Sequence, residues 1–135
     1  MRVSSRAIII ENGKILTMFR RVLRNGIIKE YNAIPGGGQE SGETLEQNVT
    51  RELKEEMNID IEILGYLGKT EDNERQEHYF ACAIKNGTPN LGGEELEKQS
   101  SENYYEPMWV SLNNPKGISK TDLIFANKAL NKEYI

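Results

Sequence analysis

The sequence has few of the residues and patterns that mark several large protein classes. It contains one cysteine, Cys82, so an internal disulfide is excluded, and the apolar residues around Cys82 predict a buried thiol of a cytoplasmic protein. It contains one histidine, His78, and without a second His or Cys a zinc site is not predicted. No signal peptide is visible, and the apolar run 7–10, flanked by Arg6 and Glu11, is far too short to span a membrane.

The sequence also lacks an excess of positive charge. Its 17 Lys and Arg residues against 21 Asp and Glu residues give a formal net charge of −4. Proteins that bind nucleic acids or membrane surfaces usually present a basic excess, so neither partner is predicted. There is no internal repeat or low-complexity segment, and the 135 residues are predicted to form a single domain, 1–135, with a sizeable core.

The most chemically distinctive stretch runs from Gly37 to Ile59. With Gly36 before it, it opens with three consecutive glycines, which allow a ligand to approach the main chain closely. Thr44 with Gln47 forms a capping-box pattern that predicts the start of a helix, and Asn58, which tolerates a left-handed conformation, predicts its end. This helix carries an apolar stripe made of Leu45, Val49, Leu53 and Met57.

Three glutamates stand near the end of this predicted helix. Glu52, Glu55 and Glu56 are spaced i, i+3 and i+4, so their carboxylates project from neighbouring sites on one face. Like charges so placed repel one another and oppose the helix dipole, and a divalent cation reverses that balance. Clustered oxygen ligands are what Mg²⁺ or Mn²⁺ requires. The alternative is a solvated acidic face balanced by Arg51 and Lys54.

The spacing of these residues resembles the signature of the Nudix hydrolase family, the box 37–59. The matching positions are Gly37, Glu43, Arg51-Glu52-Leu53, Glu55-Glu56 and Ile59. The one departure is Asn58, where the family usually has Gly, and little consequence is expected because Asn adopts the same backbone conformation. The resemblance implies an α/β (α+β) sandwich in which a mixed β-sheet packs between the box helix and a C-terminal helix.

The resemblance also implies an activity: Mg²⁺- or Mn²⁺-dependent hydrolysis of a pyrophosphate bond in a nucleoside diphosphate joined to another group. The metal shell would comprise the Gly37 carbonyl and the catalytic residues Glu52, Glu55 and Glu56, of which Glu52 or Glu56 could accept the proton of the attacking water. Glu43 and Arg51 would hold loop and helix together by an ion pair, and Arg51 could also pair with Glu55.

The identity of the small-molecule nucleotide substrate stays open, with a nucleoside triphosphate, a damaged one included, or a nucleotide sugar as the candidates. Subfamilies that cleave ADP-ribose or dinucleoside polyphosphates tend to carry a Pro or a Tyr where this chain has Arg75-Gln76-Glu77. Two other functions are alternatives: a ligand-sensing member without turnover, and an isomerase that would use Cys82 and His78 on one face of a strand.

Strands are predicted on both sides of the box. They cover Val3–Ile10, Lys14–Val22, Ile27–Tyr31, Asp60–Thr70, Glu77–Lys85 and Met108–Leu112. Asn12-Gly13 and Asn25-Gly26 predict tight hairpins, and the residues Ala33-Ile34-Pro35 resemble the family's short strand before the box. Glu77–Lys85 lacks polar alternation, which predicts burial on both faces.

Several residues outside the box have more than one interpretation. Arg20 and Arg21 either keep an edge strand soluble or bind a substrate phosphate. Trp109 either packs in the core or stacks on a base, and His78 is expected at the surface or a strand end. The stretch 86–105 is predicted to be a loop whose acids, Glu94, Glu95, Glu97 and Glu102, include a candidate catalytic group that spacing does not identify.

The end of the chain is predicted to form a closing helix. Ser119 with Asp122 marks its start, and Leu123, Ala126 and Leu130 are expected on its inner face. Exposed strands in the first hairpins leave a homodimer open.

Overall fold

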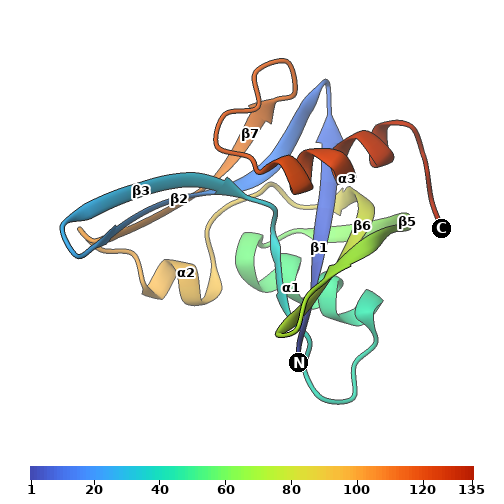
Figure 1. Ribbon diagram of the computed structural model, residues 1–135, viewed down its shortest axis with the longest axis horizontal. Helices are drawn as coiled ribbons and strands as arrows, with labels where there is room; N and C mark the ends of the chain where they lie inside the picture. Colours follow the sequence, from blue (N-terminus) through green and yellow to red (C-terminus); the bar gives the residue numbers. More distant parts are fainter.

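The structure, a computed structural model of residues 1–135, is an α/β sandwich with a seven-stranded mixed sheet (Figure 1). The strands are β1 (Arg2–Glu11), β2 (Lys14–Arg24), β3 (Ile27–Ala33), β4 (Gly36–Gly38), β5 (Asp60–Glu71), β6 (Arg75–Asn86) and β7 (Asn103–Ser111). The helices are α1 (Leu45–Met57), α2 (Gly93–Glu97) and α3 (Lys120–Leu130). None of them has the length and apolar content needed to cross a bilayer.

Strand β1 lies at the centre of the sheet, in the order β3-β2-β1-β6-β5. It pairs in parallel with β6, where Ser5 is opposite His78, and antiparallel with β2 at the first hairpin. Its first half also pairs antiparallel with β4, where Ser5 is opposite Gly37. Strand β7 pairs with β2. The three glycines of β4 are therefore paired with the central strand of the sheet.

The predicted turn and cap signals are confirmed. Asn12 and Asn25 have φ angles of 51° and 52°, and each is followed by a glycine in the left-handed region, as a two-residue hairpin requires. Helix α1 begins with the predicted capping box, since Thr44 Oγ1 accepts from Gln47 N at 3.1 Å and Gln47 Oε1 accepts from Thr44 N at 2.8 Å. It ends at Asn58, whose φ of 57° is left-handed.

Two apolar cores lie on opposite faces of the sheet, one under α1 and one under α3 (Figure 1). The α1 core includes the predicted stripe residues Val49, Leu53 and Met57, all fully buried. Strand β6 is buried on both faces, as predicted, because Phe80 and Cys82 belong to the core under α1 while Tyr79 and Ala81 belong to the core under α3.

The structure corrects two predicted elements. The short strand before α1 is not Ala33-Ile34-Pro35 but Gly36–Gly38 itself. A Cβ atom at Gly36, where φ is 149°, would collide with the Ser5 carbonyl, so glycines predicted as a loop form the strand that fits there. The stretch 86–105 is not all loop, because it contains α2 and the first residues of β7.

Two side chains lie elsewhere than predicted. His78 is buried, 7% exposed, rather than at the surface, and its ring nitrogens are satisfied by Tyr66 at 2.7 Å and Gln76 at 2.6 Å. Leu130 is 51% exposed, and the inner face of α3 is formed by Phe125 and Ala126. Phe125 stacks on a ring of β6, 3.9 Å between centroids, and this contact sets the rotation of α3.

Candidate functional site

Three successive turns of α1 contact the glycine strand β4. Asn48 Nδ2 donates to the Gly37 carbonyl at 3.2 Å. The Glu52 carboxylate lies against Gly37, where an added Cβ atom would be 2.5 Å from Oε2. Glu56 Oε2 accepts a hydrogen bond from Gly36 N at 3.3 Å. The spacing of four residues along the helix therefore aligns two of the three box acids with the main chain of the glycines.

Glu56 is the most perturbed acid of the box. Its side chain is 3% exposed, and its Oε1 has no hydrogen-bond partner. Burial raises the pKa of Glu56 to about 8, the charge of Glu95 adds to this, and Arg20, whose Nη2 lies 4.0 Å from Oε1, opposes it. A buried carboxyl with one free oxygen, in a cavity lined with acids, is suited to hold a cation or accept a proton.

Arg51 pairs with the other two acids. Its Nη1 lies 3.0 Å from Glu52 Oε1 and 3.1 Å from Glu55 Oε2. Burial raises the pKa of Glu52, while the Arg51 charge lowers it. Glu55 is the most accessible of the three, with a side chain that is 55% exposed.

Arg51 also joins α1 to the loop that precedes it. Its Nη2 donates to Glu43 Oε1 at 2.8 Å, and its Nε donates to Glu43 Oε2 at 3.0 Å, which is a bidentate pair. This hydrogen bonding holds the pKa of Glu43 at about 2. Arg51 thus pairs with both Glu43 and Glu55, so the two interactions anticipated for this residue coexist.

The box acids do not form a ready-made metal centre. No group of three His, Cys, Asp or Glu side chains is arranged to hold a metal ion, because Arg51 lies between Glu52 and Glu55. The donor set nevertheless fits a hard divalent cation, since three carboxylates stand beside glycine main chain and one Glu56 oxygen is unpaired.

Two glycine carbonyls differ in their availability to such a cation. The Gly37 carbonyl accepts the Asn48 amide. The N–H and C=O of one strand residue point to the same edge, and Gly36 N–H points to Glu56. The Gly36 carbonyl therefore lies on the Glu56 edge of β4, where Arg6 Nη1 is its partner at 3.5 Å.

An acid-lined cavity of about 340 Å³ separates α1 from α2. It is lined by Glu40, Arg51, Glu52, Glu55, Glu56, Gly93, Glu94, Glu95 and Glu97. The sequence did not choose a catalytic candidate among four loop acids, and three of them, Glu94, Glu95 and Glu97, therefore face the box. Glu102 does not, since it does not line this cavity and its carbonyl accepts a hydrogen bond from Leu23 N just before β7 begins.

Glu95 is the acid of α2 that interacts with the centre of the site. Its Oε1 lies 3.9 Å from Arg20 Nη2, and its charge raises the pKa values of both Glu52 and Glu56. The main chain before α2 caps the end of α1, since Gly92 N donates to the Glu56 carbonyl at 3.0 Å. Glu95 is the site residue that spacing did not identify, and the sequence signal for it is only the local abundance of acids.

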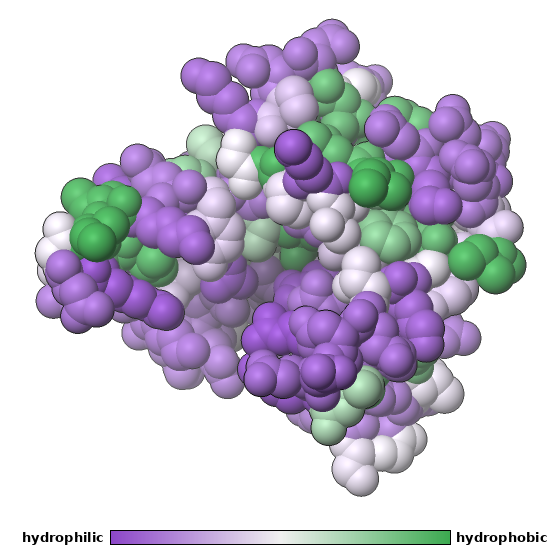
Figure 2. Space-filling view, viewed as in Figure 1, coloured by the Kyte–Doolittle hydropathy of each residue, from purple (hydrophilic) through white to green (hydrophobic).

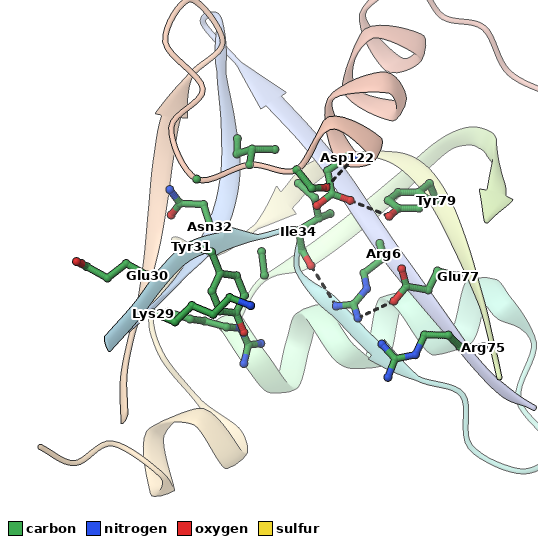
Figure 3. Close-up of a pocket in the computed structure, with 15 residues that line it drawn as sticks. Arg6, Lys29, Glu30, Tyr31, Asn32, Ile34, Arg75, Glu77, Tyr79 and Asp122 are labelled. Atoms are coloured by element: carbon green, nitrogen blue, oxygen red, sulfur yellow. Dashed lines mark hydrogen bonds and ion pairs between the residues drawn. The ribbon is translucent and has the colours of Figure 1, made fainter. Parts of the chain in front are cut away.

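A second, larger cavity of about 690 Å³ opens beside the box, and Figure 2 shows the hollow that separates the β2–β3 hairpin from the body of the molecule. Its lining residues are Arg6, Arg20, Lys29, Glu30, Tyr31, Asn32, Ala33, Ile34, Arg75, Glu77, Tyr79, Gly117, Ile118, Ser119 and Asp122. Arg6 donates to the Ile34 carbonyl at 3.2 Å and pairs with Glu77 at 3.4 Å, and Tyr79 donates to Asp122 at 2.7 Å (Figure 3).

Arg20 lines the larger cavity and lies within 4.0 Å of two acids that line the smaller one, Glu56 and Glu95. Its guanidinium carbon lies 5.3 Å from the centroid of the Tyr105 ring. Arg21, on the opposite face of β2, is exposed, stacks on Tyr104 and lines neither cavity. Of the two candidate phosphate-binding arginines, the structure brings Arg20 alone to the site.

The other candidate residues lie outside the site. His78 and Cys82 are buried under α1, and burial raises the pKa of the Cys82 thiol to about 12, so no reactive thiolate is available for an isomerase. Trp109 packs against the α1 core, which agrees with the core interpretation.

Comparisons with known proteins agree with this geometry. The model of the NUDIX domain matches residues 1–127. An ADP-ribose pyrophosphatase from Methanocaldococcus jannaschii is 31% identical over 129 residues, which span 95% of this chain and 69% of that protein.

Solved structures share the fold at lower identity. A NUDIX-family hydrolase from Clostridium perfringens has a TM-score of 0.71 at 15% identity, covering 97% of both chains. A NUDIX hydrolase from Nitrosomonas europaea has a TM-score of 0.69 at 16% identity, covering 98% of this chain and 89% of that one. A UDP-X diphosphatase has a TM-score of 0.67 at 18% identity, and this chain spans 64% of its length.

Proposed function

Because the chain belongs to the Nudix family, and is a Nudix pyrophosphohydrolase, we propose that it hydrolyses a nucleoside diphosphate joined to a second group, with Mg²⁺ or Mn²⁺ held at the box. The observation that carries this proposal is the unpaired, buried oxygen of Glu56 in an acid-lined cavity, 4.0 Å from Arg20, which lines a cavity large enough for a nucleotide. Residues 1–135 would form one domain around this site.

The cation would be held by Glu52, Glu55 and Glu56 together with a glycine carbonyl, for which Gly36 is better placed than Gly37. Glu52 and Glu55 would exchange Arg51 for the cation, and Arg51 would keep its bidentate pair with Glu43. When bound, the ion would acidify a water molecule and neutralise charge on the phosphates.

The chain's own residues would supply the remaining chemistry. Glu56 is buried and has one carboxylate oxygen without a hydrogen-bond partner, so it suits a proton acceptor for the attacking water, and Glu95 faces it from α2. Arg20 would bind an oxygen of the diphosphate, because its guanidinium lies between the acids and the larger cavity.

The larger cavity would hold the two groups that flank the diphosphate. Its polar lining, with Arg6, Lys29 and Arg75 among its cations, suits ribose hydroxyls and phosphate oxygens better than an apolar ligand. A substrate of the ADP-ribose class agrees with the relative named ADP-ribose pyrophosphatase.

The test is phosphate release from ADP-ribose, nucleotide sugars, nucleoside triphosphates and dinucleoside polyphosphates, with a coupled phosphatase and with or without Mg²⁺ or Mn²⁺. Glu52→Gln and Glu56→Gln should each lower metal-dependent kcat by about 100-fold or more. Glu62→Gln, which removes the same charge from an exposed position on β5, is the matched control and should leave turnover intact. Turnover that survives both box substitutions would contradict the proposal.

A further inference from the structure

The Asn48 amide is a fully buried polar group of α1 that the mechanism above does not use. Its Nδ2 donates to the Gly37 carbonyl at 3.2 Å and to the Gly38 carbonyl at 2.9 Å. A primary amide has two N–H donors, so both are committed to the glycine strand. The two acceptors also fix the orientation of the amide, because the opposite orientation would set Oδ1 against two carbonyl oxygens.

Packing alone does not account for an asparagine at this position. The Oδ1 atom of Asn48 is buried and has no hydrogen-bond partner. A buried acceptor without a donor destabilises the folded state, and an apolar side chain of similar size would avoid that penalty. What distinguishes Asn48 from a leucine here is the pair of hydrogen bonds to the two glycine carbonyls.

The other side chains that join α1 to β4 are charged. Glu52 lies against Gly37, Glu56 accepts from Gly36, and Arg51 Nη2 donates to the Gly38 carbonyl at 2.9 Å. Under the proposed function, Glu52 and Glu56 turn toward a cation and Arg51 loses two of its carboxylate partners. The contacts of the two glutamates with the glycine strand therefore change when the metal binds, and Arg51, which holds Gly38, changes its partners.

Asn48 is the neutral member of this set, and its hydrogen bonds do not depend on the charge in the site. We propose that Asn48 is a positioning residue, which anchors the glycine strand on the box helix and thereby sets the affinity of the metal site. This inference rests on the proposed function. In it, Asn48 touches neither metal nor substrate, and it holds β4 so that Gly36 and Glu56 stay in register while the charged contacts rearrange.

The experiment measures Mn²⁺ binding and stability separately. Asn48→Leu keeps the branching at Cγ and the number of side-chain heavy atoms and removes the hydrogen bonds, and Asn48→Ala, which adds no bulk, serves as a second variant if the first does not fold. Mn²⁺ affinity is followed by electron paramagnetic resonance of the free ion, without substrate, and Tm is followed in a chelator. Thr44→Ala is the matched control, because it removes a hydrogen bond of the same helix that does not reach β4.

Loss of the anchor is expected to weaken Mn²⁺ binding about 10-fold or more in both Asn48 variants. The metal-free Tm of Asn48→Leu should stay near the wild-type value, because loss of the unpaired Oδ1 offsets loss of the two hydrogen bonds. Thr44→Ala should show the reverse pattern, a lower Tm with unchanged Mn²⁺ affinity.

Two results would overturn the inference, and they differ in what else they overturn. If the wild type binds Mn²⁺ and the Asn48 variants bind it equally well, Asn48 is only a structural residue and the proposed function stands. If the wild type binds no Mn²⁺, the metal site itself is absent, and the proposed function falls together with the role of Asn48.

Discussion

Glu56, which lines the acid cavity, and Arg20, which lines the larger cavity, face each other with 4.0 Å between Glu56 Oε1 and Arg20 Nη2. This separation is too long for a hydrogen bond, so the carboxyl keeps an unpaired oxygen in a buried place. The guanidinium in turn stays beside the larger cavity, which Arg20 lines. The pair therefore leaves both groups available, one to a cation or a proton and the other to a phosphate.

The burial of Glu56 predicts that the metal-free protein loses stability as the pH rises from about 5 to about 8. Its pKa is raised from 4.5 to about 8 in the folded state, so over this window the folded protein keeps a proton that the unfolded chain has released. The stabilisation is complete below pH 4.5 and is lost as the pH rises through 8, with a total on the order of a few kcal/mol. Urea unfolding at several pH values in a chelator measures it.

Glu56→Gln should remove most of this slope, leaving the smaller contribution of Glu52, whose pKa is shifted in the same direction. Glu55→Gln changes the formal charge equally at an exposed position and should retain the slope. An unchanged pH dependence in Glu56→Gln would show that another group carries it. Added Mg²⁺ should stabilise the wild type more at pH 8 than at pH 5, because the cation displaces the proton.

Substitution of the two neighbouring arginines on β2 should have unequal effects. Arg20→Ala should lower kcat/KM by about 10-fold to 100-fold, the value of one charge-assisted hydrogen bond to a phosphate oxygen. Arg21→Ala, on the exposed face, should change kcat/KM little. The comparison is made by steady-state kinetics on whichever nucleotide of the substrate panel turns over. Equal losses of kcat/KM in both variants would contradict the assignment of Arg20.

Much of the box could be predicted from the sequence because its signals are local. The Thr44 and Gln47 cap, the Asn58 end and the two Asn-Gly turns each depend on residues a few positions apart, and all are confirmed. The alternation of a strand likewise predicts that Arg20 and Arg21 lie on opposite faces.

The remaining features depend on contacts between distant segments. Which face of β2 meets the acids is decided by the fold and not by alternation, so the sequence could not choose between Arg20 and Arg21. Helix α2 has no buried residue and so no apolar pattern to predict it. The position of α2 beside α1 is fixed by main-chain hydrogen bonds from the residues before α2 to the end of α1. Gly92 N donates to the Glu56 carbonyl and Asn90 N donates to the Met57 carbonyl.

Glu95 is predicted to assist the reaction from α2. Glu95→Gln should lower kcat by about 10-fold to 100-fold with a smaller change in KM, since the residue faces the box acids and would act on the transferred proton or the metal. Glu102→Gln is the control, because that side chain does not line the acid cavity. If Glu102→Gln lowers kcat and Glu95→Gln does not, the assignment of Glu95 is wrong.

Gly37 and Glu52 lie so close together that a side chain at position 37 should disturb the metal site. A Cβ atom at position 37 would lie 2.5 Å from Glu52 Oε2, so Gly37→Ala must displace that carboxylate from the glycine strand or shift the strand itself. Stability should fall by about 1 to 3 kcal/mol, and metal-dependent turnover should fall with it. Gly38→Ala is the matched control, because a Cβ atom there meets nothing within 4 Å and its side chain would point into open space. Chemical unfolding and turnover over a range of Mg²⁺ concentrations separate the two variants. If Gly37→Ala behaves like Gly38→Ala in both measurements, the carboxylate of Glu52 moves freely and its place beside the glycine main chain has no part in the metal site.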